Sequence, residues 1–335
     1  PQGTNEWDKE IEQIAKDWGM YIIYKDIDST DLNMTWSTKP TWTTPVLVAN
    51  PVTDEEVVVY LDLVKNYLLG NMDSTKKEDL AALPYYFYFV KDLNDGNPNS
   101  MTYGQMSLQI YQEGFNYWAL SFTSEELEGG LAPAQLHKVA SSFIYPSLQS
   151  RFRSGEYVVP AEFGDISDYE TRVGIDYMSV EEFVAMYGMP AEYYSMIVLP
   201  DSQDEANYYR NRGFAPTVSE NFEIEWGMFN ACPTWLLWII VFEEPSWGII
   251  ESQNPNFDNV PDLEGRILED FLNMVRLAML YPEDKMMEEF PVDVENPMEA
   301  EGNRKIMEKY DIVVRYMKDT YNFDLQAVAN ILNGE

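Results

Sequence analysis

The feature that most constrains the fold of this chain is its shortage of metal-binding and cross-linking side chains, with one histidine and one cysteine in 335 residues. A single cysteine, Cys232, excludes an intramolecular disulfide and a metal site of several thiolates, and its apolar neighbours predict a buried, inert thiol. A catalytic zinc site usually has three protein ligands, two or more of them imidazoles, which one histidine cannot supply. Apolar packing must therefore hold the fold, and 45% hydrophobic residues are enough for a large core.

The chain is strongly acidic. Its 57 aspartate and glutamate residues outnumber 22 lysines and arginines, which gives a formal net charge of −35. This charge repels phosphate backbones and anionic lipid surfaces, so we do not expect binding to nucleic acid. No apolar run approaches the roughly 20 residues that span a bilayer. Because the chain begins with proline rather than methionine, we expect a trimmed chain from which a signal segment was removed.

Hydrophobic periodicity predicts an α+β protein with two parts. Residues 1–130 form an N-terminal α+β part with a small sheet. Its expected elements are helices over residues 7–18 and 53–69 and strands over 21–24, 84–91 and 115–122. Residues 131–335 form a helix-rich part. Its expected helices cover residues 133–145, 180–186, 203–212, 233–242, 263–280, 304–320 and 324–332, with a solvated connection over 288–302.

Four separate blocks of the chain resemble one known family. They are residues 7–25, the Pro-Ala-Glu-Phe segment within 159–163, the Arg-Gly-Phe turn at 212–214 and the closing segment at 313–325. In order and spacing they are similar to the substrate import-associated zinc metallohydrolases, which are surface lipoproteins of Bacteroidetes. The resemblance covers most of the chain and implies one continuous zincin-like metallopeptidase fold.

In that family the motif His-Glu-x-x-His lies on one helix, because residues four apart share a face and two imidazoles can reach one zinc ion. One alignment places His137 a turn before the motif, and the three motif positions are then Ser141, Ser142 and Tyr145. The other alignment places His137 and Lys138 on the first two positions and Ser141 on the last. Both alignments lose the zinc ligands and the general base.

A second segment of the family's site is also changed. The resemblance aligns an acidic stretch of the family with residues 233–238 of this chain, where Trp235 and other apolar residues stand instead. An isolated buried carboxylate costs several kcal/mol, so apolar replacements suit a site that has lost its cation. We therefore expect no zinc, no other cofactor and no catalytic residue. The degenerate motif positions that we take as a candidate cleft are His137, Ser141, Ser142, Tyr145 and Trp235.

Smaller features favour structural explanations. His137 fits a polar residue on a core-facing helix, and Pro146 is expected to end or bend that helix. Residues 26–31 and 92–97 carry alternating oxygen ligands but lack the glycine and glutamate of an EF-hand loop. A tight hairpin turn explains the second of these segments better than calcium does.

Aromatic residues outside the expected core could contact a ligand. Trp36 and Trp42 lie in a polar, turn-like segment, and we expect them to be able to stack against a ligand such as a sugar ring. Exposed aromatic residues also mark protein interfaces, so both alternatives remain open.

The resemblance and the missing ligands together predict a non-catalytic surface lipoprotein. We expect a binding or accessory component of a Bacteroidetes nutrient import system, most simply for glycans, at the outer membrane or cell surface. Its expected partners are outer-membrane import proteins and a glycan or peptide ligand, and its only expected membrane contact is an N-terminal lipid anchor. The alternative is a peptidase-like hydrolase that uses a non-standard site with carboxylates such as Glu162 or Asp165.

Overall fold

The computed structural model forms two compact units, which we describe separately: unit 1, Pro1–Ser150, and unit 2, Arg151–Asn333. Our division of the chain at residue 130 stays a prediction. The structure describes residues 5–34, 41–105, 110–112, 114, 116–171, 173–174, 179–188, 190, 205–219, 221–225, 231–233, 235–238 and 261–334.

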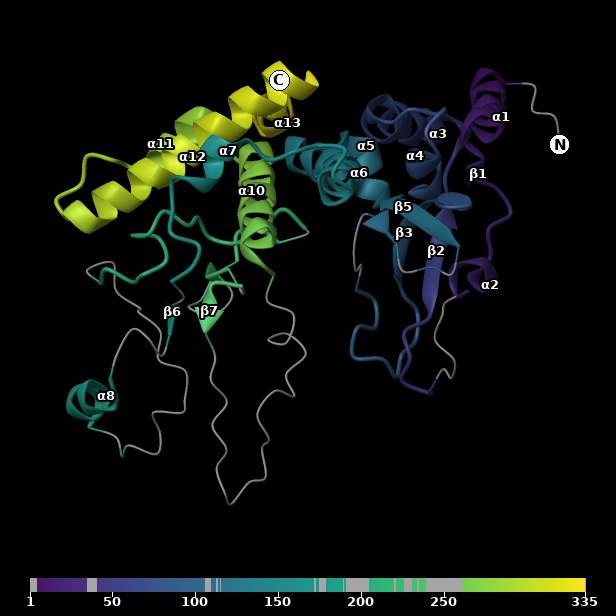
Figure 1. Ribbon diagram of the computed structural model, residues 1–335. Coiled ribbons are helices and arrows are strands. Elements are labelled where there is room, and N and C mark those ends of the chain that lie inside the picture. Colours follow the sequence, from purple (N-terminus) through teal and green to yellow (C-terminus); the bar gives the residue numbers. More distant parts are fainter. Residues whose placement is uncertain are drawn as a thin grey trace. The chain divides into compact units, whose positions relative to one another are not determined.

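Unit 1 is built on a five-stranded mixed sheet (Figure 1). Three strands are parallel, namely β1 (Tyr21–Ile23), β3 (Tyr86–Asp95) and β5 (Tyr117–Phe122). Strand β2 (Leu47–Pro51) pairs antiparallel with β3, and β4 (Ile110–Tyr111) pairs antiparallel with β5. The strands are rich in aromatic and β-branched residues, as their propensities require. The expected α+β class with a small mixed sheet agrees with this arrangement.

The helices of unit 1 begin at side-chain caps that are visible in the sequence. The Thr53 hydroxyl accepts a bond from the backbone of Glu56, whose carboxylate bonds back to Thr53, and Thr123 and Glu126 repeat this capping box. Gly19 ends the first helix with φ +68°. The helices of this unit are α1 (Glu6–Trp18), α2 (Ser29–Leu32), α3 (Asp54–Leu63), α4 (Lys77–Ala81), α5 (Ser124–Gly129) and α6 (Pro133–Arg153), which runs on past Ser150. Helix α3 continues through a π turn (Val64–Leu68) and a 3-10 turn (Leu69–Asn71).

The two faces of the sheet bury different residues, because side chains alternate along a strand. One face packs against α1, α3 and α6 in a core that includes Phe87, Phe89 and Phe143. The other face packs in a smaller core around Tyr88 and Tyr117, together with Leu32 of α2. The Tyr117 hydroxyl donates a hydrogen bond to the carbonyl of Leu32, which holds α2 over that face.

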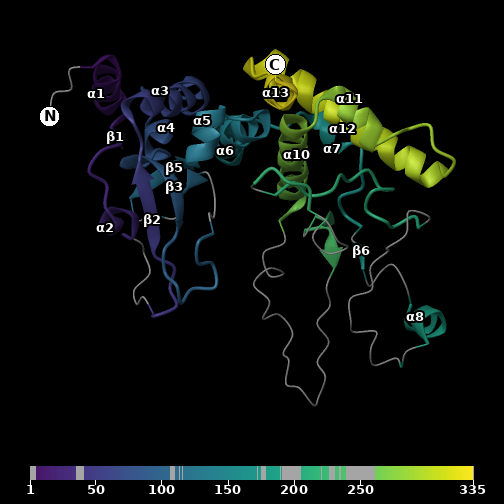
Figure 2. The ribbon, with the colours of Figure 1, turned by 180° about the vertical axis from the view of Figure 1, so that it is seen from behind.

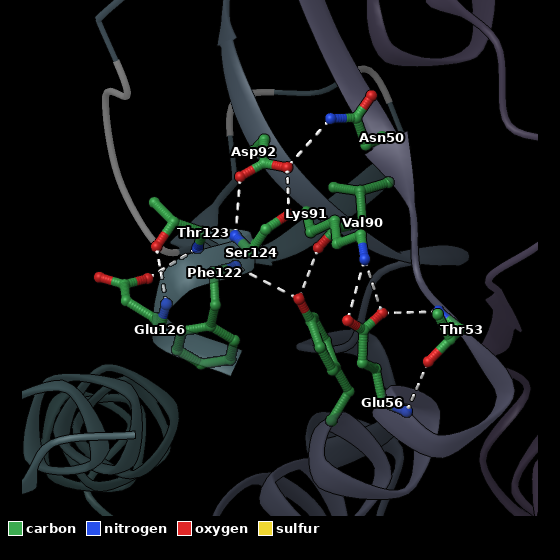
Figure 3. A network of polar contacts seen from close by, with 11 residues as sticks. Asn50, Thr53, Glu56, Val90, Lys91, Asp92, Phe122, Thr123, Ser124 and Glu126 are labelled. Carbon is green, nitrogen blue, oxygen red and sulfur yellow. Dashed lines mark hydrogen bonds and ion pairs between the residues drawn. The ribbon is translucent and has the colours of Figure 1, made fainter. Parts of the chain in front are cut away.

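Polar contacts of Val90, Lys91 and Asp92, in the middle of β3, fix where α3 and α5 start (Figure 3). Lys91 Nζ lies 2.9 Å from Glu56 Oε1, and buried Tyr60 donates to the Val90 carbonyl at 2.7 Å. Asp92 has φ +56° at a bulge in the β2–β3 pairing, and its carboxylate accepts bonds from the backbone and hydroxyl of Ser124 at 2.8 and 2.7 Å. The chain therefore enters α5, and after it α6, from a fixed position.

Unit 2 is mainly helical (Figure 2). The long helix α10 (Leu263–Leu280) is buried over most of its second half and packs against α12 (Pro297–Tyr321) and α13 (Leu325–Asn330). Its other elements are α7 (Ala161–Gly164), α8 (Val180–Tyr187), α11 (Glu283–Glu289), the 3-10 turn η5 (Ile331–Asn333) and the two-stranded parallel sheet of β6 (Val173–Gly174) and β7 (Leu237–Trp238). Within the described residues, no helix is both long enough and apolar enough to cross a membrane.

One expectation for unit 1 was wrong and another was wrong in part, since of the two effects expected of Pro146, ending or bending its helix, the first is contradicted. Pro146 does not end α6, which continues to Arg153; Pro146 is exposed while its neighbours Tyr145 and Ser147 are buried, so its ring does not interrupt the packed face. The tight hairpin within residues 92–97 is not formed, because β3 runs through to Asp95 and pairs with β5 rather than with β4.

Three expectations for unit 2 were also wrong. Residues 205–213 form turns instead of a helix, and the Asn211 side chain donates a hydrogen bond to the Glu205 carbonyl, six residues earlier, in place of a helical backbone bond. Residues 237–238 form β7 where we expected a helix, because their aromatic and β-branched surroundings favour a strand. Of the two helices expected over 203–212 and 233–242, residues 203, 204, 234 and 239–242 lie outside the described part. The connection expected over 288–302 ends early, since Asn296 caps α12 at Pro297.

Candidate functional site

The motif positions on α6 are packed into the protein. Ser141 is 0% exposed and His137 is buried, and the Ser141 hydroxyl lies 3.3 Å from His137 Nε2. Tyr145 is also buried, and its hydroxyl accepts a bond from Gln149 Nε2 at 3.5 Å, while Ser142 is half-buried. The helix periodicity thus brings His137 and Ser141 into contact as their spacing predicts.

The residues at these positions do not fit a zinc ion. In the alignment that places His137 a turn before the motif, buried Ser141 and Tyr145 stand where two imidazoles are needed, and half-buried Ser142 stands where the general base is needed. Among the residues that the structure describes, no group of three or more histidine, cysteine, aspartate or glutamate side chains is placed to hold a metal. The loss of zinc stays a prediction, and we route no chemistry through it.

The fifth member of the candidate cleft lies in unit 2. Trp235 is buried, stacks on Tyr169 with ring centroids 5.8 Å apart and meets Phe214 edge-on at 5.4 Å. Those contacts explain its apolar character. A cleft formed by Trp235 together with the four α6 residues stays a prediction.

Unit 2 contains a buried ionic cluster that the sequence analysis missed. Lys309 of α12 is 0% exposed, and its ammonium lies 2.7 Å from Asp270 Oδ2 of α10. The same ammonium donates to the Gly213 carbonyl at 2.8 Å, and Tyr169 donates to Asp270 Oδ2 at 2.7 Å. The Phe214 ring faces the ammonium at 4.3 Å. The two charges therefore neutralise each other out of contact with water, through Asp270 Oδ2, while Asp270 Oδ1 has no hydrogen-bond partner among the described residues.

Two blocks of the family resemblance contribute residues to this cluster. Phe163, from the block at 159–163, lies 5.6 Å from the Lys309 ammonium, and Gly213 and Phe214 come from the turn at 212–214. Helix α12 carries both Lys309 and the start of the closing block at 313–325. Gly213 has φ +86°, and a Cβ there would lie 2.6 Å from Lys305 Cβ, so only glycine fits the turn. Residues of these two blocks therefore pack around the buried pair of Lys309 and Asp270.

Electrostatics and access indicate a structural role for this cluster. Burial lowers the pKa of Lys309, and the charge of Asp270 opposes that effect. Burial and then the neighbouring Asp270 carboxylate raise the pKa of Tyr169 well above its usual value. The sequence did contain a sign of the buried charge, since Lys309 falls on the same face of α12 as the apolar residues Ile306 and Val313.

The remaining predicted residues are dispersed. Glu162 is exposed and pairs with Arg315 at 3.2 Å, and Asp165 is exposed at the end of α7, so neither carboxylate is held in a pocket of its own. Cys232 is buried as expected, and burial raises the pKa of its thiol to about 12. Trp42 is exposed, whereas Trp36 lies outside the described residues.

Replacing Lys309 with methionine removes the ammonium while keeping a long side chain, and leaves the Asp270 carboxylate buried beside apolar groups. We expect Lys309→Met to lower the free energy of unfolding by about 3–5 kcal/mol in urea denaturation, and the added Asp270→Leu to restore a large part of it. Arg304→Met, at an exposed position of the same helix that makes surface ion pairs with Glu301 and Glu308, is the control, with an expected change within about 1 kcal/mol. If Lys309→Met and the double variant lose the same unfolding free energy, the unpaired Asp270 carboxylate is not the cause of the loss.

Replacing Ser141 with histidine tests whether the α6 position is packed. Because the side chain is fully buried, we expect Ser141→His to cost about 1–3 kcal/mol in unfolding free energy through overpacking. The matched control is Ser142→His, one residue along at a half-buried position, where we expect a smaller loss. A neutral Ser141→His would mean that the position has room for an imidazole ligand.

Comparisons with known proteins give little beyond these residues. No protein-family model matches the chain, and no curated protein matches it in sequence. A solved structure from Bacteroides caccae, described as a "putative zinc-binding metallo-peptidase", is similar over 99% of this chain and 94% of its own, at 13% identity and a TM-score of 0.40. At that score we draw no conclusion from the likeness about the fold or the activity of this chain.

Proposed function

We propose that this chain is a non-catalytic binding protein of zincin-like fold, acting as an accessory surface lipoprotein of a nutrient import system. The observation that carries the proposal is the packing of the only histidine in the chain. His137 is buried against Ser141, at the helix position where a metallohydrolase would present its ligands. The resemblance to import-associated lipoproteins supplies the expected location and partners.

The chemistry of α6 supports the non-catalytic part of this proposal. A metal-dependent hydrolase needs a positioned base and an open coordination position for water. The α6 residues offer an imidazole in contact with a serine hydroxyl, both closed off from solvent. Glu162, the carboxylate of the hydrolase alternative, is paired with Arg315 in solvent, which gives that alternative no specific support.

Metal analysis of the purified protein tests the non-catalytic proposal. After incubation with zinc and dialysis, we expect clearly less than one zinc per chain by elemental analysis, and no peptidase activity that is lost on chelation. His137→Ala serves as the control, because residual zinc on surface carboxylates would be the same in both proteins. One zinc per chain that disappears in His137→Ala would overturn the proposal.

Protease treatment of intact producing cells tests the proposed location. A lipid-anchored protein on the outer surface should be digested while the cells are whole, and a periplasmic marker should stay intact as the control. Protection of the protein until the cells are lysed would contradict a surface location.

A further inference from the structure

Two loop segments at one end of the unit 1 sheet, residues 41–46 and 96–105, are largely exposed and carry no charged side chain. One loop leads into β2 and the other leaves β3, and both lie at the same end of the sheet (Figures 1 and 2). Residues 41–46 and 96–105 contain no charged side chain, although 24% of the chain is charged and its net charge is −35. We call residues 41–46 and 96–105 together the loop-tip surface.

The loop-tip surface exposes large apolar side chains. Trp42 is 76% exposed, Tyr103 is 58% exposed and Met101 is 97% exposed, and Val46 is also exposed. Scattered exposed apolar residues are ordinary, but these four lie on two loops that are hydrogen-bonded to each other, and exposed apolar residues that gather on one surface mark binding sites. Tryptophan and tyrosine are also the residues that most often anchor contacts, because a rigid apolar ring carries a polar group at its edge.

Hydrogen bonds hold the two loops to each other. The Asn97 side chain donates to the carbonyls of Trp42 and Thr44 at 3.0 and 2.7 Å, and the Gly96 backbone donates to Val46 at 2.8 Å. The buried carboxylate of Asp95 accepts bonds from the backbones of Val46 and Asn97, both at 2.9 Å. Such a surface is ordered before a ligand arrives, so binding loses little conformational entropy.

The Asp95 carboxylate lies buried beneath these loops, so it is not one of the groups that a ligand on the surface would contact. Burial alone would raise its pKa, but bonds from the Ser100 side chain and from the Asn97 and Val46 backbones outweigh burial and lower that pKa. The Thr102 hydroxyl completes its partners at 2.8 Å. The acid therefore acts as an internal support for both loops.

Residues with neutral hydroxyl groups flank Trp42 and Tyr103 in the sequence. The hydroxyl of Thr41 lies 3.1 Å from those of Thr43 and Thr44, on both sides of Trp42. The hydroxyls of Ser100 and Thr102 lie 3.0 Å apart, next to Tyr103. Hydroxyl groups can both donate and accept, so they can match a ligand that carries many hydroxyls of its own.

We propose that the loop-tip surface binds a neutral oligosaccharide, with sugar rings packed on Trp42 and Tyr103. The C–H face of a pyranose packs on an aromatic ring, and its hydroxyls can bond to the threonine and serine hydroxyls at the rim. The net charge of −35 repels an anionic polymer, and the uncharged surface gives a cationic peptide no carboxylate to bind. This inference deepens the proposed function by naming a ligand class, and it rests on that function only for the idea that the protein binds without catalysis.

A glycan array tests this site, using neutral gluco-, manno- and galacto-oligosaccharides beside sulfated and uronic-acid glycans. We expect binding to at least one neutral glycan, and calorimetry should show it weakened about tenfold or more by Trp42→Ala and also reduced by Tyr103→Ala. Tyr85→Ala, which removes an exposed tyrosine from the start of the sheet instead, should bind normally.

The array has outcomes that overturn the inference. Binding only to charged glycans, binding unchanged by Trp42→Ala, or no binding to any neutral glycan would each do so. If Trp42 is instead needed to bind a protein partner or neutral lipid vesicles, and no neutral glycan binds, the surface is a site for that protein or lipid. Because zinc content is measured separately, loss of the glycan site leaves the non-catalytic proposal standing, and the reverse also holds.

Discussion

Moving an ammonium and a carboxylate out of water costs several kcal/mol for each ion, so Lys309 and Asp270 can stay buried only while both keep their partners. Those partners come from distant parts of the chain: the Gly213 carbonyl, the Tyr169 hydroxyl and the ring of Phe214. Helices α10 and α12 must also approach closely enough for a 2.7 Å contact. Alternative packings of unit 2 would leave at least one charge uncompensated. The Lys309–Asp270 pair therefore adds little net stability, but it favours the one packing of α10 and α12 in which both charges keep their partners.

Unit 1 handles its excess of carboxylates differently. Some carboxylates pair with lysines, such as Glu56 with Lys91, but several others accept hydrogen bonds from backbone N–H groups. Asp28 caps α2, Asp92 takes the backbone of Ser124, and Asp95 takes those of Val46 and Asn97. Burial tends to raise the pKa values of Asp92 and Asp95, but their hydrogen bonds lower both. A carboxyl with a lowered folded pKa stabilises the fold above its unfolded pKa of about 3.9, and that stabilisation is lost as the pH falls through the folded value.

Local signals explain what could be predicted from the sequence. The helix over 263–280 and the strand beginning at Tyr21 were found because periodicity and end signals agree there. The helix expected over 233–242 failed because an apolar, aromatic run has no periodicity to separate helix from strand. The Lys309 cluster joins segments up to 146 residues apart, from Phe163 to Lys309, and no local pattern carries that information. The exposure of Trp42 was predictable from its polar neighbours, whereas the role of Asp95 as a support depends on loops that meet only in the folded chain.

A fold does not fix a function, since function belongs to sites placed on folds. Helix α6 holds His137 and Ser141 as buried packing residues, while the exposed rings of Trp42 and Tyr103 lie on loops. Loops tolerate change in sequence better than a buried helix does, because fewer packed neighbours depend on them. Charged side chains hold water more tightly than neutral ones do. In a molecule of net charge −35, an uncharged ligand therefore loses less hydration energy on the neutral loop-tip surface than on a charged surface. Packing in α6 and binding at the loop-tip surface can therefore vary independently.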